Sequence, residues 1–227
     1  AIDSGRDPGI FPSDVQGAIA DLHNLKVPSS TYSYIFKLLS EVRQGEVSTD
    51  DAVGIMRVIE SFLFRRAIGG YEPTGLHAVF KVLWQETEAN VNARAVYEAI
   101  KRRRTVPWPN DEEFRETVIN GNLYGRTVAR YAIAEFESSR PGETPDDEFE
   151  IEHILPQTPH EDWLPLPEDF TNKTTSWANL IPITKTMNTE SSNRPFHQKR
   201  TAYKASKFSS TREIEKNYSS WTSETLK

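Results

Sequence analysis

The stretch FEIEHILPQTP, residues 149–159, places a carboxylate and a titratable imidazole side by side inside an apolar run. The pair is Glu152 and His153, and two amides, Asn179 and Asn188, follow later in the chain. Hydrolysis of a phosphodiester near neutral pH needs a base to take a proton from water and a hard cation to neutralise developing charge. Histidine fits the first need. Carboxylate and amide oxygens fit the second, because Mg²⁺ prefers oxygen ligands and keeps several waters.

Glu152 and His153 can serve one site only under a geometric condition. Adjacent side chains on a regular strand point to opposite faces, so we expect the strand to be frayed or distorted at this pair. Pro156 favours this, since it donates no ladder hydrogen bond and restricts the residue before it. We expect the Asn179 amide to bond backbone of a long loop and fix the histidine's orientation, and Asn188 to lie at a helix start.

The elements that must position these residues are short. Strands are predicted at FEIEHIL (149–155) and WANLIPI (177–183), with a long proline-rich loop between them (156–176) and a helical or partly helical stretch after them (184–205). The unit is too small for a doubly wound sheet. It predicts a compact site built on a two-stranded hairpin and one helix.

The preceding part of the chain has a helical pattern. From residue 13 to about 138, apolar residues recur at intervals of three and four residues. Ser48 and Asp51 have capping-box-like spacing at one helix start, and Gly69 and Gly70 end that helix. This pattern predicts a helical bundle whose aromatic residues are mostly core.

A change of composition marks the expected domain boundary. The segment SSRPGETPDDE, residues 138–148, is rich in proline, glycine, serine and acid. We therefore expect a mainly α chain, with a helical domain over residues 1–142 followed by a small α+β domain over residues 143–227.

Charge is unevenly distributed along the chain, although the net charge is −6. Residues 143–169 carry ten Asp or Glu and no Lys or Arg, whereas residues 171–212 carry eight Lys or Arg against one Glu. A basic stretch is often only a solvated face, but such a reversal favours an anion-binding surface. The candidate nucleic-acid contacts are Lys185, Arg194, His197, Lys199, Arg200 and Lys204.

Composition also excludes several classes of protein. The chain has no cysteine, so disulfides and thiolate metal sites are excluded, which fits a cytoplasmic protein. No apolar run approaches the ~20 residues that a membrane helix needs, so no membrane partner is expected. Because the chain begins with Ala1 rather than Met, we expect its natural N-terminus to be missing and the chain to be a fragment.

The motifs EIEHILPQ, WANLIPIT, MN and SNRPFHQK resemble those of the C-terminal nuclease domain of GmrSD-type restriction enzymes, a branch of the HNH or His-Me finger nucleases. The upstream segment SFLFRRAIGGYEPTGLHAVFKVL resembles the helical region that precedes this nuclease. The resemblance implies an N-terminal helical bundle followed by a small α+β ββα-metal (HNH) domain. It also implies a partner, the family's N-terminal nucleotide-hydrolysing half. Nothing in this sequence resembles that half, so the chain is interpreted as a C-terminal piece of a longer enzyme.

The resemblance assigns roles residue by residue. It makes His153 the general base, Glu152 and Asn188 the ligands of Mg²⁺ or Mn²⁺, and Asn179 the residue that helps to aim the histidine. It implies an endonuclease or nickase that leaves 5′-phosphate and 3′-hydroxyl ends on double-stranded DNA. The setting it implies is the prokaryotic cytoplasm, in defence against phage that responds to modified bases or backbone phosphorothioates.

Other interpretations of the same residues remain open. The chain could be a catalytically silent module that binds DNA or docks on a partner, or it could cleave RNA. Glu152 could tune only the pKa of the histidine, and the two asparagines could be turn or cap residues. His160 and His197 could join His153 in a zinc site, although their spacing does not favour one.

Two tryptophans of the second domain have no role in the proposed chemistry. Trp163 and Trp177 are interpreted as core lids over a small domain, with base stacking as the alternative.

Overall fold

The computed structural model describes residues 9–141, 148–166, 168–222 and 225. Two compact units follow one another in the chain, Ala1–Phe114 and Arg115–Lys227, and the division falls within α6 (Asp111–Asn120). The domain boundary expected at residues 142 and 143 lies outside the described residues. Among the described residues, no helix is both long enough and apolar enough to cross a membrane.

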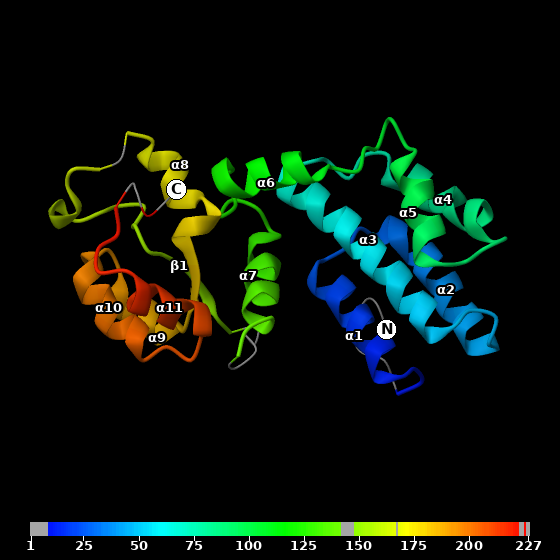
Figure 1. Ribbon diagram of the computed structural model, residues 1–227, viewed down its shortest axis with the longest axis horizontal. Helices are drawn as coiled ribbons and strands as arrows, with labels where there is room; N and C mark the ends of the chain where they lie inside the picture. Colours follow the sequence, from blue (N-terminus) through cyan, green and yellow to red (C-terminus); the bar gives the residue numbers. More distant parts are fainter. Residues whose placement is uncertain (1–8, 142–147, 167, 223–224, 226–227) are drawn as a thin grey trace. The chain divides into compact units, whose positions relative to one another are not determined.

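The first unit is entirely helical, as predicted. Its central helix is the 21-residue α3, which packs against α1, α2 and α5 (Figure 1). The Ser48 hydroxyl caps α3 by accepting a hydrogen bond from the Asp51 amide at 3.0 Å, and Gly70 ends the helix in the left-handed conformation. The helices of this unit are α1 (Ser13–Asn24), α2 (Tyr32–Gln44), α3 (Thr49–Gly69), α4 (Leu76–Thr87) and α5 (Ala93–Lys101), with the 3₁₀ turn η1 (Ser29–Thr31).

The second unit is built around one two-stranded antiparallel sheet. Helices α9 and α10 lie on one side of this sheet, and α7 lies on the other (Figure 1). The elements in chain order are α7 (Ala129–Ser138), β1 (Glu150–His153), η2 (Glu161–Trp163), α8 (Phe170–Thr175), η3 (Trp177–Asn179), β2 (Leu180–Ile183), α9 (Lys185–Ser191), α10 (Phe196–Lys204) and α11 (Ser209–Asn217).

The order strand, loop, strand, helix is confirmed, with differences in detail. The predicted loop contains the short helix α8, and the predicted helical stretch is two helices rather than one. The chain breaks between α9 and α10 because Ser192 takes a positive φ of 40° and Pro195, which donates no amide hydrogen bond, precedes α10. The terminal helix α11 was not expected.

The register of the sheet determines which side chains share a face. Glu150 pairs with Ile183 and Glu152 with Ile181, so these residues point toward α9 and α10. Ile151 and His153 alternate with them and therefore point to the other face. Every residue of β2 is buried, which agrees with a sheet covered on both faces.

The core of the second unit lies between the sheet and α10. Its buried apolar residues come from the end of β1, from β2, from α10 and from the last described turn of the chain. The cluster contains Ile154, Leu155, Ile181, Ile183, Phe196, Tyr203 and Trp221. Trp221 packs in this cluster with Ile154 and Leu155, so a residue close to the end of the chain contributes to the core beside the hairpin.

A buried carboxylate connects α11 with α7. Glu137 on α7 is 1% exposed and accepts hydrogen bonds from the amides of Ser209 and Ser210, the latter at 3.1 Å to Oε2. These are the first amides of α11, which have no partner within their own helix. A carboxylate at a helix start also interacts favourably with the helix dipole.

We predict that Glu137→Ala lowers the free energy of unfolding by about 2 kcal/mol, because it leaves buried amides without an acceptor. Urea denaturation measures the loss. Glu137→Gln, which keeps one acceptor oxygen, should lose less, and Ser138→Ala on the exposed neighbouring position should change stability by less than about 0.5 kcal/mol. Equal stability of Glu137→Ala and Ser138→Ala would contradict the capping role.

Candidate active site

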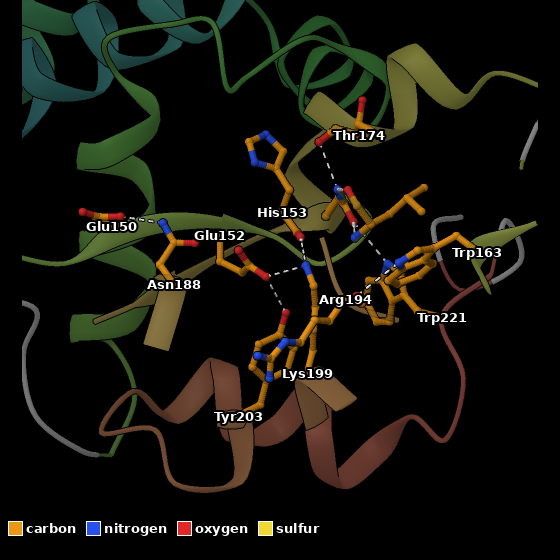
Figure 2. Close-up of polar contacts among 12 residues, drawn as sticks. Glu150, Glu152, His153, Trp163, Thr174, Asn188, Arg194, Lys199, Tyr203 and Trp221 are labelled. Carbon is orange, nitrogen blue, oxygen red and sulfur yellow. Dashed lines mark hydrogen bonds and ion pairs between the residues drawn. The ribbon is translucent and has the colours of Figure 1, made fainter. Parts of the chain in front are cut away.

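Glu152 and His153 lie on opposite faces of a regular strand. Pairing continues through both residues, since Glu152 opposes Ile181 and His153 opposes Leu180. The expected distortion is therefore absent at the pair, and β1 ends after it, before Pro156. Figure 2 shows the His153 ring pointing away from Glu152 and Asn188. Any site that uses both residues must lie at the end or edge of β1.

Asn179 holds the chain where β1 ends. Its side chain is fully buried, its Oδ1 accepts from the Leu155 amide at 2.7 Å, and its Nδ2 donates to the carbonyls of Leu155 at 2.9 Å and Thr174 at 3.0 Å. The indole of Trp221 adds a bond to Oδ1 at 3.2 Å. The amide thus joins the backbone at both ends of the long loop, two residues from His153. This geometry supports a role in orienting the histidine, which stays a prediction.

Glu152 is part of a buried cluster with two residues of α10. The ammonium of Lys199 donates to Glu152 Oε1 at 2.6 Å, and the Tyr203 hydroxyl donates to the same oxygen at 2.9 Å (Figure 2). Lys199 also donates to the carbonyl of His153 at 2.8 Å. All three side chains are almost completely buried. Lys199 therefore links α10 to both residues of the Glu-His pair.

Burial shifts the pKa values of this cluster. Burial raises the pKa of the Glu152 carboxyl, and the charge and hydrogen bond of Lys199 oppose that shift. Burial lowers the pKa of the Lys199 ammonium, and Glu152 opposes it in turn. Burial also raises the pKa of Tyr203 well above its ordinary value, so its hydroxyl stays protonated and donates.

The predicted DNA contacts divide into two groups. Lys199 is 1% exposed, so it cannot reach a phosphate on the surface; its charge is used inside the domain. Arg200 is half-buried and paired with Glu215, donating to its carbonyl at 2.8 Å and to its carboxylate at 3.0 Å. The remaining four candidates are exposed: Lys185, Arg194, His197 and Lys204.

His153 is enclosed on one side by an aromatic ring. The ring of Tyr124 meets the imidazole edge to face, with 4.1 Å between centroids. No described residue provides a hydrogen-bond partner for the buried Nε2. Burial, and secondly the charge of Lys199, lowers the pKa of His153 to about 4. The imidazole is therefore neutral at physiological pH and able to accept a proton.

One open pocket of about 340 Å³ connects the predicted site residues. Glu152, His153 and Asn188 line it, together with Pro156, Gln157, Thr158, Ser192 and Asn193. Asn188 lies in α9 and donates through Nδ2 to the Glu150 carboxylate, which leaves its Oδ1 for another interaction. Of the four predicted site residues, Asn179 is the one that does not line this pocket.

The donor set of this pocket fits a hard divalent cation. Mg²⁺ or Mn²⁺ takes carboxylate and amide oxygens and needs only one or two protein ligands, which Glu152 and Asn188 can supply. Lys199 competes for the Glu152 carboxylate. The described residues include no group of three or more His, Cys, Asp or Glu that could hold a metal.

Three neighbours of the site were not predicted: Tyr203, Tyr124 and Glu150. Lys199 and Tyr203 are four residues apart, which places them on one face of a helix, and this spacing was the available signal. The pairing of Asn188 with Glu150 has no signal in the local sequence. Tyr124 lies far before β1 and on the other side of the expected domain boundary, so only the folded chain connects it with His153.

Comparison with known families finds one match to the second part of the chain. Residues 108–227 match the family model described as GmrSD restriction endonucleases, C-terminal domain. The match includes Tyr124, the hairpin, the cluster of Glu152 with Lys199 and Tyr203, and Trp221. No curated protein matches the chain.

We predict that Lys199→Met lowers the free energy of unfolding by roughly 3–5 kcal/mol, because it leaves the Glu152 carboxylate buried without its counter-charge. Chemical denaturation measures the loss. Arg200→Met, at a half-buried pair on the same helix, should cost about 1 kcal/mol or less. Adding Glu152→Gln to Lys199→Met should recover part of the stability. A Lys199→Met protein as stable as Arg200→Met would contradict the structural role.

We predict that His153 titrates near pH 4 in the metal-free protein, well below its ordinary value of 6.5. The folded state then binds fewer protons than the unfolded state between these values, so stability falls as pH falls through this window. An NMR titration, assigned by comparison with His153→Gln, measures the pKa. The same variant should show a weaker loss of stability between pH 6.5 and 4. Titration at 6.5 would contradict the burial of the ring.

Proposed function

The chain belongs to the family of GmrSD restriction endonuclease C-terminal domains, a nuclease domain of the restriction type, and from this premise we propose that it is a metal-dependent DNA endonuclease of the HNH type. The observation that carries the proposal is one open pocket at the end of a two-stranded hairpin, lined by His153, Glu152 and Asn188. A base and two oxygen ligands in one pocket are the groups that phosphodiester hydrolysis requires.

His153 is proposed as the general base. The ring is neutral at physiological pH and can take a proton from water, although burial in the metal-free protein makes it a weaker base than an exposed histidine. Since Nε2 is buried, Nδ1 is the nitrogen that would accept this proton. The Asn179 amide and the bond from Lys199 to the His153 carbonyl hold the backbone on both sides of the ring.

Glu152 and Asn188 are proposed to hold Mg²⁺ or Mn²⁺. A bound cation would neutralise charge on the phosphate and on the departing 3′ oxygen. Because Glu152 and His153 flank the same strand, a substrate phosphate lying along the end of β1 could reach both groups. Attack of water on the phosphorus and departure of the 3′ oxygen would leave 5′-phosphate and 3′-hydroxyl ends.

The exposed cations define how DNA would approach. Lys185, Arg194, His197 and Lys204 belong to the segment that contains α9 and α10, next to the pocket residues Asn188, Ser192 and Asn193. Cations on the contact face release counterions from DNA, which supplies affinity without sequence preference. We propose double-stranded phage or foreign DNA as the substrate, in the prokaryotic cytoplasm. A nucleotide-hydrolysing domain, which this sequence does not include, would be the partner that controls cleavage.

One observation favours a second candidate function. The Glu152 carboxylate is already engaged by Lys199 and Tyr203, which suits a module that binds DNA without cutting it. Such a module would show salt-dependent DNA binding and no cleavage with any divalent metal.

RNA cleavage is a separate alternative. A cleavage assay with single-stranded RNA as the substrate, in the presence of the same metals, distinguishes it from DNA cleavage.

We predict that the protein nicks supercoiled plasmid with Mg²⁺ or Mn²⁺ and that His153→Ala reduces the rate by about 10²- to 10⁴-fold. Conversion to open-circular plasmid on a gel measures the rate. His160→Ala, at an exposed histidine paired with Asp162 outside the pocket, is the matched control and should keep full activity. Equal nicking by wild type and His153→Ala would refute the catalytic role.

A further inference from the structure

A second pocket lies beside the proposed active site. It has a volume of about 410 Å³, and the side chains of Trp163, Leu164, Pro165, Phe196, His197 and Trp221 are among its lining residues. Leu164 is 66% exposed, whereas Trp163 is half-buried and packs partly against the core cluster of the unit. None of the proposed catalytic and metal-binding residues lines this second pocket.

The two pockets are neighbours on two separate stretches of chain. Leu155 lines the second pocket, and the next residue, Pro156, lines the pocket of His153. In the same way Pro195 lines the second pocket, and Asn193 lines the first. The two pockets are therefore lined by adjoining residues of the same two segments.

The aromatic walls of the second pocket are held in place. The Trp163 indole donates to the Arg194 carbonyl at 3.1 Å, which ties the loop after β1 to the start of α10 (Figure 2). Trp221 donates to Asn179 and packs on Phe196 with 5.6 Å between ring centroids. Rings already fixed before binding lose little entropy when a flat ligand stacks on them.

The pocket is lined by polar groups that include the Asp162 carboxylate, and the positive charge of Arg194 lies next to the lining residues in the chain. His197 lines the pocket, and Arg194, directly before Pro195, is exposed. Asp162 and the hydroxyls of Ser219 and Thr222 provide acceptors and donors at the wall. Flat apolar walls with polar groups at their edge suit a nucleobase, whose faces stack and whose edges form hydrogen bonds.

We propose that this pocket binds one unpaired nucleobase of the DNA strand that enters the neighbouring active-site pocket. The base stacks on Trp163 against the apolar wall, and Arg194 and His197 contact the adjoining phosphates. This inference rests on the proposed function, because it takes DNA to be the ligand of the first pocket. The pocket would hold the DNA strand by binding a base that has left the stack of its neighbours. In duplex DNA, unstacking that base costs a few kcal/mol.

The test uses binding of the full chain to a single-stranded oligonucleotide that contains the fluorescent base 2-aminopurine, in EDTA so that no cleavage occurs. Wild type should change the 2-aminopurine fluorescence on binding. Trp163→Ala should weaken binding by about five- to hundredfold and abolish that change, because base stacking on an aromatic ring supplies this much affinity. Trp163→Phe keeps a stacking ring and should stay within about threefold of wild type.

Trp177→Ala is the matched control, since Trp177 is also half-buried in this unit but packs against Phe136 outside the pocket. It should bind as wild type does. The proposal is overturned if wild type does not bind the strand, if Trp163→Ala binds as wild type, if both alanine variants lose affinity equally, or if Trp163→Phe is as weak as Trp163→Ala. This binding assay contains no metal and does not depend on cleavage. If wild type failed to nick plasmid in the separate assay with metal, the catalytic function would be refuted and the base-binding result would stand.

Discussion

The buried ion pair between Lys199 and Glu152 is the interaction on which the second unit depends. Placing two charges in the interior costs several kcal/mol per ion unless geometry and additional hydrogen bonds compensate. Here the ammonium has the Glu152 carboxylate at 2.6 Å and the His153 carbonyl at 2.8 Å, and Tyr203 gives the carboxylate a second donor. An apolar replacement could fill the space but would lose the hydrogen bond from α10 to the His153 carbonyl.

This pair also influences the chemistry on the other face of β1. The charge of Lys199 adds to burial in lowering the pKa of His153, although the imidazole and the ammonium belong to opposite sides of the strand. Lys199 is the second cause of this shift, after burial of the ring. The same lysine engages the carboxylate that is proposed to hold the metal, so the balance between ion pair and metal ligation determines how Glu152 is used.

Asn179 provides the second constraint, from the opposite end of the loop. Its amide satisfies the backbone groups of Leu155, where the sheet ends, and receives the indole of Trp221. Buried backbone groups without partners are costly, so a side chain that satisfies several of them stabilises one conformation of the strand end. The same amide therefore bonds both Trp221, in the wall of the second pocket, and Leu155, two residues after His153.

Much of this arrangement is determined by local sequence. Apolar spacing and capping residues such as Ser48 predict the helices of the first unit, because a helix start depends on neighbours within one turn. The order of hairpin and helix and the candidate residues His153, Glu152, Asn179 and Asn188 also follow from short motifs. Four of the six predicted DNA contacts are exposed, as a contact to phosphate requires.

Only the tertiary structure decided which of these residues are buried and what they contact. Lys199 and Lys204 are both lysines on α10, yet one is enclosed and the other is exposed, because only Lys199 faces the carboxylate of Glu152. Tyr124 meets His153, and Trp221 meets Asn179, across long separations in the chain. Residue type and spacing therefore determined the chemistry available to this protein. Burial and partner choice, which depend on packing between distant segments, decided where that chemistry can operate.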